Sequence, residues 1–255
     1  MGLTPPRRYW LTGAGNGLGA SLAEAILDTG AHLAASSRSV QFCEALSVRY
    51  PGQVLALPGD LTDSQTVREI GEQIARRWGS LDTVILNAGT AEYIDGQPPP
   101  ATFIEHLLRS NLLAASYCVD TAQPLLRAGT APHLVGIASP ATYLPLSHTE
   151  AGGAMRYLFE STRVELAAKG IDVTLVHPGF DSLHLSLESN QATALRTVDE
   201  AAAHILNHLI ERPAELELPV AALTTLWPLP ASAQTAQTDT APSQANVWSP
   251  IKGQP

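Results

Sequence analysis

Short apolar runs alternate with longer segments of helical periodicity along the first 220 residues of this chain. Each apolar run has the length of a strand, and each intervening segment has the length of a helix. Strands that read as continuous apolar runs and are joined by helices form a parallel sheet that is covered on both faces. The pattern therefore predicts an α/β fold, a doubly wound parallel sheet.

The expected strands are Tyr9–Leu11, His32–Ala35, Val54–Leu57, Thr83–Leu86, His133–Ala138, Ile171–Val176 and Glu215–Val220. The expected helices are Leu18–Thr29, Gln41–Arg49, Ser64–Trp78 with Ser64 as N-cap, Thr102–Leu126, Met155–Lys169, and a segment from a Thr197–Glu200 capping box to about Ile210. Residues 1–230 are predicted to form one domain. Residues 231–255 are rich in Ala, Gln, Thr, Ser and Pro, and such a segment buries too little apolar surface to become ordered, so we predict a disordered tail.

Composition narrows the classes of function. The chain of 255 residues is 45% hydrophobic and 15% charged, which is typical of a soluble globular protein. Its net charge of −9 argues against a nucleic-acid partner, because phosphates favour a basic surface. No apolar run is long enough for a membrane span, and no signal peptide is recognised. With only Cys43 and Cys118, a disulfide framework is not expected, and the predicted location is the cytoplasm.

A glycine-rich turn lies between the first strand and the first helix. Its residues are Thr12, Gly13, Gly15, Asn16, Gly17, Leu18 and Gly19. Glycines allow a tight turn and the close approach of a pyrophosphate, and the helix N-terminus offers free N–H groups and a partial positive charge. The alternative is a plain strand–helix turn, but the position at the start of a strand–helix–strand unit favours a dinucleotide site.

The pattern Thr12-Gly13-x-x-x-Gly17-x-Gly19 resembles the cofactor motif of the short-chain dehydrogenases/reductases. Five further matches follow in the order and spacing of that family: Asp60 with Leu61 at the adenine ring, Asn87-Ala88-Gly89 beside the cofactor, Asn111 as the active-site Asn, Ser139 as the catalytic Ser, and Pro178-Gly179 beside the nicotinamide. The resemblance spans about residues 7–220. It implies a Rossmann-type fold, a nicotinamide cofactor and a carbonyl or alcohol as substrate.

The end of the second strand bears on the choice of cofactor. An acid there would bind the ribose 2′-OH of NAD, but the segment is Ala34-Ala35-Ser36-Ser37-Arg38-Ser39. A guanidinium with small hydroxyls suits a 2′-phosphate, so NADP(H) is predicted in preference to NAD(H). The alternative is that Arg38 is a solvated loop residue.

The family's catalytic Tyr-x-x-x-Lys is missing. Counting about thirteen residues from Ser139 places the Tyr at Gly152 and the Lys at Arg156. Counting back about eighteen residues from Gly170 places the Lys at Gly152 and the Tyr at His148. The two counts differ by four residues, which predicts that about one helical turn has been lost. Neither alignment supplies a Tyr followed by a Lys.

Substitutes for the missing residues are few. His148 is the candidate proton donor, because imidazole titrates near neutrality, and the alternative is a solvated loop histidine. Tyr143 and Tyr157 fit a pocket wall and ordinary packing better than catalysis. Arg156 could hold a ribose or a phosphate, but its fixed charge donates no proton at neutral pH.

Three hypotheses remain open from the sequence. The chain is an oxidoreductase with a rearranged proton donor, or a pseudoenzyme that binds the nucleotide and acts as a partner or sensor, or its shortening is a deliberate change or an anomaly of the sequence. The substrate would be a small carbonyl or alcohol, covered by residues 180–188. Self-association through the two long helices is expected by resemblance, and no metal site is predicted.

Overall fold

The computed structural model describes residues 5–15, 17–87, 105, 108–138, 151–178, 195 and 197–219. The expected tail, residues 231–255, lies outside these ranges, as do residues 180–188.

A seven-stranded sheet in which every strand pairs in parallel runs through the described residues, in the order β3-β2-β1-β4-β5-β6-β7. The strands are β1 (Arg8–Thr12), β2 (His32–Ser36), β3 (Val54–Ala56), β4 (Thr83–Leu86), β5 (His133–Ile137), β6 (Asp172–Pro178) and β7 (Glu215–Leu218). The strand order reverses between β1 and β4, as in the doubly wound folds that bind dinucleotides. The predicted fold class is confirmed.

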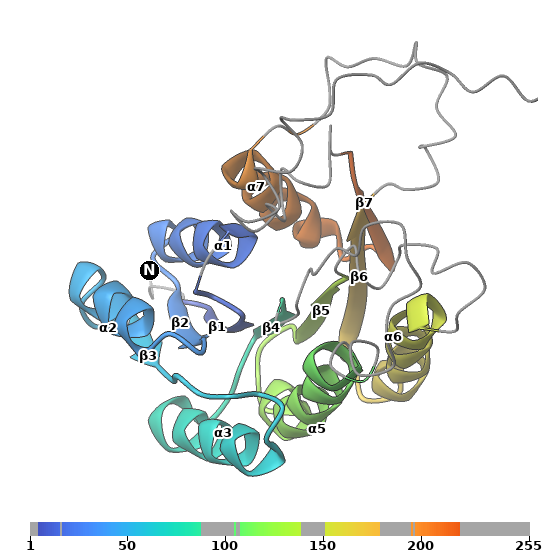
Figure 1. Cartoon of the computed structure of the whole chain (residues 1–255), viewed down its shortest axis with the longest axis horizontal. Helices are drawn as coiled ribbons and strands as arrows, with labels where there is room; N and C mark the ends of the chain where they lie inside the picture. Colours follow the sequence, from blue (N-terminus) through green and yellow to red (C-terminus); the bar gives the residue numbers. More distant parts are fainter. Residues whose placement is uncertain are drawn as a thin grey trace, which may run out of the picture.

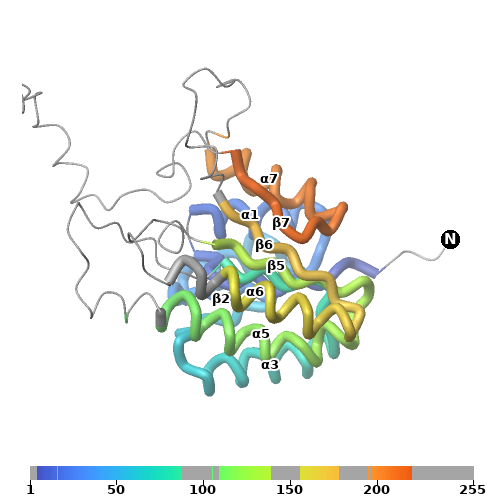
Figure 2. The backbone as a smooth tube through the Cα atoms, turned by 90° about the vertical axis from the view of Figure 1, so that its right-hand side faces the viewer, coloured from blue at the N-terminus to red at the C-terminus, as the bar shows by residue number. Residues whose placement is uncertain are grey.

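Helices cover both faces of the sheet (Figure 1). One face carries α1 (Gly17–Asp28), α2 (Val40–Arg49) and α7 (Val198–His208), and the other carries α3 (Ser64–Trp78), α5 (Ala114–Arg127) and α6 (Ala151–Ala167). Figure 2 shows α3, α5 and α6 as one layer beneath the strands. A six-residue π-helix, Leu108–Leu113, leads into α5.

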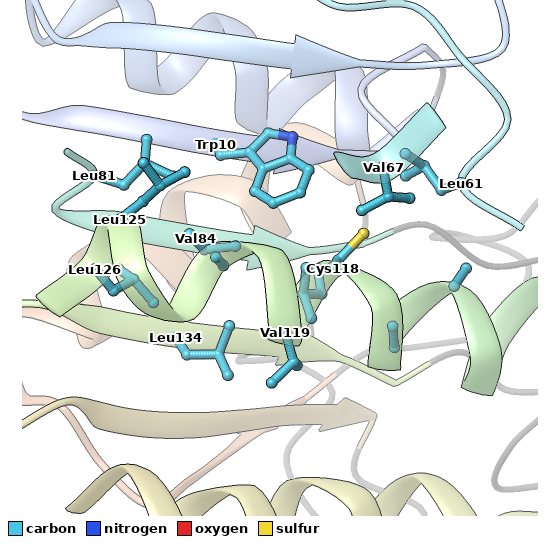
Figure 3. Close-up of a cluster of buried hydrophobic side chains, with 14 of the residues drawn as sticks. Trp10, Leu61, Val67, Leu81, Val84, Cys118, Val119, Leu125, Leu126 and Leu134 are labelled. Atoms are coloured by element: carbon cyan, nitrogen blue, oxygen red, sulfur yellow. The ribbon is translucent and has the colours of Figure 1, made fainter. Parts of the chain in front are cut away.

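The larger apolar core lies between the sheet and the α3, α5 and α6 layer. Trp10 is fully buried at its centre, and Val67 of α3 and Cys118 of α5 close over the same region (Figure 3). Burial raises the pKa of the Cys118 thiol to about 12, so this cysteine stays protonated and acts as a small apolar side chain.

Two of the predicted helix starts are wrong, and one predicted helix is not α-helical throughout; its expected start at Thr102 lies outside the described residues. Asp63, not Ser64, is the N-cap of α3, because its carboxylate accepts hydrogen bonds from the backbone N–H groups of Gln65 and Thr66. The long helix expected over residues 102–126 contains the π-helical turn, which widens the backbone ahead of α5. The helix expected from Met155 begins at Ala151 instead. The capping box of Thr197 and Glu200 is confirmed.

Close packing against β5 fixes the height of α6 above the sheet. A Cβ at Gly136 would lie 2.0 Å from Cζ of Phe159, so the ring occupies the space that any larger residue would need. Gly152 lies seven residues, or almost two turns, before Phe159 and therefore shares its helix face. Seven residues of helix rise about 10 Å, or about three residues of strand, which places Gly152 level with the carboxyl end of β5.

Polar side chains tie the amino edge of the sheet together. The buried carboxylate of Asp82 accepts hydrogen bonds from the backbone N–H of Arg8 at 2.8 Å, from the Arg8 guanidinium at 3.1 Å and from the backbone N–H of Thr130 at 2.8 Å. Burial alone would raise the pKa of Asp82, but these hydrogen bonds together lower it below its ordinary value. Arg7 and Arg212 both donate to the carbonyl oxygen of Ala131 in the turn before β5.

His133 is buried at the start of β5. Its Nε2 lies 2.8 Å from the hydroxyl oxygen of Thr174, which itself donates to the carbonyl oxygen of Pro213. Since the hydroxyl proton is used there, Nε2 is the nitrogen that donates. Burial, together with the charge of Arg212, lowers the pKa of His133 to about 4.

The fit between α6 and β5 predicts a specific coupling. Gly136→Ala should lower the free energy of unfolding by about 1–3 kcal/mol, because the new methyl group overlaps the Phe159 ring. In the background of Phe159→Leu, Gly136→Ala should lower the free energy of unfolding by less. Chemical denaturation of the wild type, the two single variants and the double variant measures this coupling. Costs that add without coupling would contradict the placement of α6.

His133 should make the fold acid-sensitive. Its pKa in the folded chain, about 4, lies below the ordinary value of 6.5, so the unfolded chain binds more protons within that window. The free energy of unfolding should therefore fall between pH 6.5 and pH 4, by up to about 3 kcal/mol. Urea denaturation across this range measures the loss, which His133→Gln should reduce.

Candidate functional site

The carboxyl ends of the parallel strands meet at one edge of the sheet, where ligands bind in doubly wound folds. The glycine-rich turn lies at this edge, between β1 and α1. Gly13 and Gly17 adopt positive φ angles of 65° and 50°, which residues other than glycine rarely adopt. The backbone N–H of Ala14 donates to the carbonyl oxygen of Ser36 at 3.1 Å, which ties the turn to β2.

A close approach joins the turn to α1 and β4. A Cβ at Gly19 would lie only 1.9 Å from the carbonyl oxygen of Gly13, so only glycine fits at this position. The side-chain amide of Asn87 donates to the same oxygen at 3.1 Å, and its backbone N–H donates to the Thr12 hydroxyl at 3.0 Å. Thr12 is buried, so its hydroxyl joins β1 to the end of β4. The structure thus brings together four of the predicted residues.

The N-terminus of α1 faces this turn without an acidic side chain in its first turn. Leu18 is buried beneath the helix and contributes to the smaller core cluster. Backbone N–H groups at the start of a helix, together with the helix dipole, favour an anion. The described part of the turn therefore fits the pyrophosphate of a dinucleotide.

Two of the small hydroxyls expected to meet a 2′-phosphate have structural partners instead. Ser36 is fully buried, and its Oγ accepts a hydrogen bond from the indole N–H of Trp10 at 3.0 Å. Ser39 is the N-cap of α2, and its Oγ accepts from the backbone N–H of Phe42 at 3.2 Å. The expectation that the hydroxyl group of Ser36 serves the cofactor is corrected by its position in the core. Sequence reasoning missed the bond from Trp10, although a buried indole N–H usually requires a partner.

Ser37 stands directly against the glycine-rich turn. A Cβ at Gly15 would lie 2.2 Å from Oγ of Ser37, so the end of β2 and the turn are in contact here. The same hydroxyl oxygen accepts from the backbone N–H of Ser39 at 3.1 Å. The Ser37 side chain therefore lies directly against Gly15 of the turn.

Arg38 follows on the outer side of this contact. Its side chain is exposed, and it makes no hydrogen bond or ion pair within the part of the chain that the structure describes. An exposed guanidinium next to a glycine-rich turn can form charge-assisted hydrogen bonds with a phosphate.

Asp60 and Leu61 follow β3 at the same edge. The exposed carboxylate of Asp60 accepts hydrogen bonds from the backbone N–H and the hydroxyl of Thr62, at 2.9 and 2.8 Å. The Leu61 side chain lies in the larger core. Asp60 therefore caps a local turn, and contact of these two residues with an adenine ring stays a prediction.

Asn111 lies in the π-helical turn before α5, and its side chain is buried. The Ser110 hydroxyl donates to its Oδ1 at 3.4 Å. π-Helical turns are rare in helices overall, and those that occur often lie at functional sites. The widened turn is a local feature that the sequence pattern did not reveal.

Most of the remaining predicted site residues lie outside the part of the chain that the structure describes. Asn16, Ala88, Gly89, Ser139, His148 and Gly179 lie outside the described residues, as does Tyr143. Pro178 is the last residue of β6, at the expected edge of the sheet.

Arg156 does not stand at this edge. Its guanidinium lies 2.6 Å from the Glu215 carboxylate of β7 and 3.7 Å from that of Glu160. His177 of β6 approaches the same Glu215 carboxylate at 3.5 Å. Arg156 therefore belongs to a charged group at the β7 side of the sheet, which argues against the alignment that equates it with the family's Lys. Tyr157, the next residue, is 72% exposed, so the expected packing role is wrong within the described residues.

Among the described residues, no group of three or more His, Cys, Asp or Glu side chains is placed to hold a metal ion. No helix in those ranges is both long and apolar enough to cross a membrane.

Comparison with known proteins agrees with this geometry. An uncharacterized oxidoreductase of Mycobacterium tuberculosis is 29% identical over 207 aligned positions, which cover 76% of this chain and 80% of that protein. An L-rhamnose 1-dehydrogenase (NAD(P)(+)) of a Sphingomonas species is 26% identical over 188 positions, which cover 70% of this chain and 74% of that protein.

A solved structure shares the fold. A short-chain dehydrogenase from Streptomyces avermitilis superimposes with a TM-score of 0.71 at 20% identity, over 92% of this chain and 95% of that one. The family model described as short chain dehydrogenase matches residues 9–193, which is more than half of the sequence, and the chain therefore belongs to the short-chain dehydrogenase family.

Proposed function

We propose that this chain binds NADP(H) in preference to NAD(H), and that as a carbonyl or alcohol oxidoreductase it works with a degenerate active site. The observation that carries the cofactor preference is the end of β2, where an exposed Arg38 borders the glycine-rich turn and no carboxylate stands at positions 36–39. The Sphingomonas relative is named for both NAD and NADP. Membership of the family therefore does not decide between the two cofactors, and the proposed preference for NADP(H) depends on the residues at the end of β2.

The described residues fit the nucleotide in three ways. The turn between β1 and α1 offers backbone N–H groups to a pyrophosphate, the contact of Ser37 with Gly15 sets one wall of the space beside the turn, and Arg38 supplies the only fixed positive charge between positions 31 and 48. When bound, the nicotinamide would supply or accept a hydride at the substrate carbon. The task left to the protein is to exchange a proton with the substrate oxygen.

The position of α6 supports the proposal that the active site is degenerate. Because Phe159 packs over Gly136, Gly152 lies level with the carboxyl end of β5, where the family's Lys would be needed. Glycine offers no side chain for this task. Arg156, the other candidate for the Lys position, is paired with Glu215. A positioned general acid contributes about 10²–10⁴ in rate, so slow turnover is expected.

Cofactor binding tests the first half of the proposal. Calorimetric titration should show tighter binding of NADPH than of NADH. Arg38→Ala should weaken NADPH binding by about tenfold or more, since a charge-assisted hydrogen bond contributes about 1.5–3 kcal/mol, and should leave NADH binding nearly unchanged. Ser37→Asp should reverse the preference by placing a carboxylate beside the turn. Equal affinities of the wild type for both nucleotides would refute the preference.

Two double variants test the second half. His148→Tyr with Gly152→Lys restores the Tyr-x-x-x-Lys spacing in the alignment that α6 supports, and turnover of an activated carbonyl with NADPH should rise about 10²-fold or more. Gly152→Tyr with Arg156→Lys restores the same spacing in the other alignment and should bring no gain.

The outcomes separate the hypotheses. A gain only in the second double variant would overturn the placement, and efficient turnover by the wild type would overturn the degenerate site itself. Loss of a slow wild-type activity in His148→Ala would identify His148 as the donor. Tight NADPH binding without turnover in any variant would favour the pseudoenzyme.

A further inference from the structure

Two histidines stand one above the other on α7. His204 and His208 are four residues apart, so successive turns of the helix place them on the same side. Their ring centroids are 4.1 Å apart and the ring planes differ by 32°. Both side chains are partly exposed, and neither belongs to the cofactor edge described above.

The pair lies on the flank of α7 that is turned away from α1. Asp199 marks the opposite flank, because its carboxylate accepts a hydrogen bond of 2.6 Å from Ser21 of α1. At 100° per residue, His204 and His208 lie about 140° and 180° around the helix from Asp199. The core-facing positions of α7 are Ala201, Ala202 and Ile205, so the imidazoles are not required to fill the core.

Hydrogen bonding fixes the tautomer of one ring. Nδ1 of His208 lies 2.8 Å from the backbone carbonyl oxygen of His204. A carbonyl oxygen only accepts, so Nδ1 carries the proton and, in the uncharged ring, Nε2 keeps a free lone pair. Histidines that bind metals are usually held in this way, with the other ring nitrogen donating to a carbonyl or a carboxylate.

We propose that His204 and His208 form a two-histidine chelate for a divalent transition-metal ion, with Zn²⁺ or Cu²⁺ as the class that imidazole nitrogens favour. Solvent completes the coordination, since no third His, Cys, Asp or Glu among the described residues is placed to join the pair. The metal links two successive turns at the C-terminal end of α7, and the inference does not depend on the cofactor or on turnover.

Zinc titration of the whole protein tests this inference. Isothermal calorimetry with ZnCl₂ at pH 7.5 should show one site, and either His204→Gln or His208→Gln should weaken it by at least about tenfold, as expected when a group that holds the metal is removed. His32→Gln, which changes a histidine stacked on Trp78 at the far side of the sheet, should leave the affinity unchanged. Cu²⁺ should bind more tightly than Zn²⁺.

A second readout excludes a merely structural effect of the substitutions. Zinc that binds only the folded chain should raise the midpoint of thermal unfolding of the wild type, and this shift should vanish in both glutamine variants while their midpoints without metal stay close to that of the wild type. Lowering the pH to 5 should also abolish the shift, because protons displace the metal. No calorimetric binding by the wild type, or equal zinc affinity in wild type and His204→Gln, would overturn the proposal.

Discussion

The contact between Gly19 and Gly13 is the constraint on which the cofactor edge depends. The carbonyl oxygen of Gly13 lies where a Cβ of residue 19 would be, so α1 approaches β1 as closely as backbone allows. Asn87 holds the same oxygen from β4. With α1 fixed in this way, its N-terminus lies at the carboxyl end of β1, beside the point where the strand order reverses between β1 and β4. A larger residue at position 19 would shift both the helix and its dipole.

The amino and carboxyl edges of the sheet carry different kinds of polar residues. At the amino edge, Asp82, Arg8 and Arg212 satisfy backbone groups in the connections, and a buried His133 is held uncharged. At the carboxyl edge, Arg38 and Asp60 remain exposed, and the helix that normally supplies the catalytic pair begins with small residues. Arg38 and Asp60 are exposed at the carboxyl edge, so substitutions at these two positions should cost little stability, in contrast to substitutions at Gly19.

Much of this arrangement could be predicted from the sequence. Apolar runs of strand length and capping signals located all seven strands and the capping box of Thr197, because these depend on local pattern. The N-cap of α3 was misplaced by one residue because Asp63 and Ser64 can both cap, and only the backbone geometry decides. The bond from Trp10 to Ser36 is a contact between two strands, and neither it nor the π-helical turn at Asn111 leaves a periodic signal in the sequence.

The contacts of α6 with the core show why changes near its N-terminal end are compatible with the fold. The helix is held from its middle by Phe159 over Gly136 and near its end by Leu166 in the core. Arg163 also donates to the carbonyl oxygens of Val173 and Ala214, which anchors the helix to β6 and to the segment before β7. The proposed loss of about one turn at the N-terminus would rotate the remaining helix by only about 40° relative to the preceding chain, so these contacts would survive it. Selection on the core and selection on the catalytic pair therefore act on different residues of the same helix.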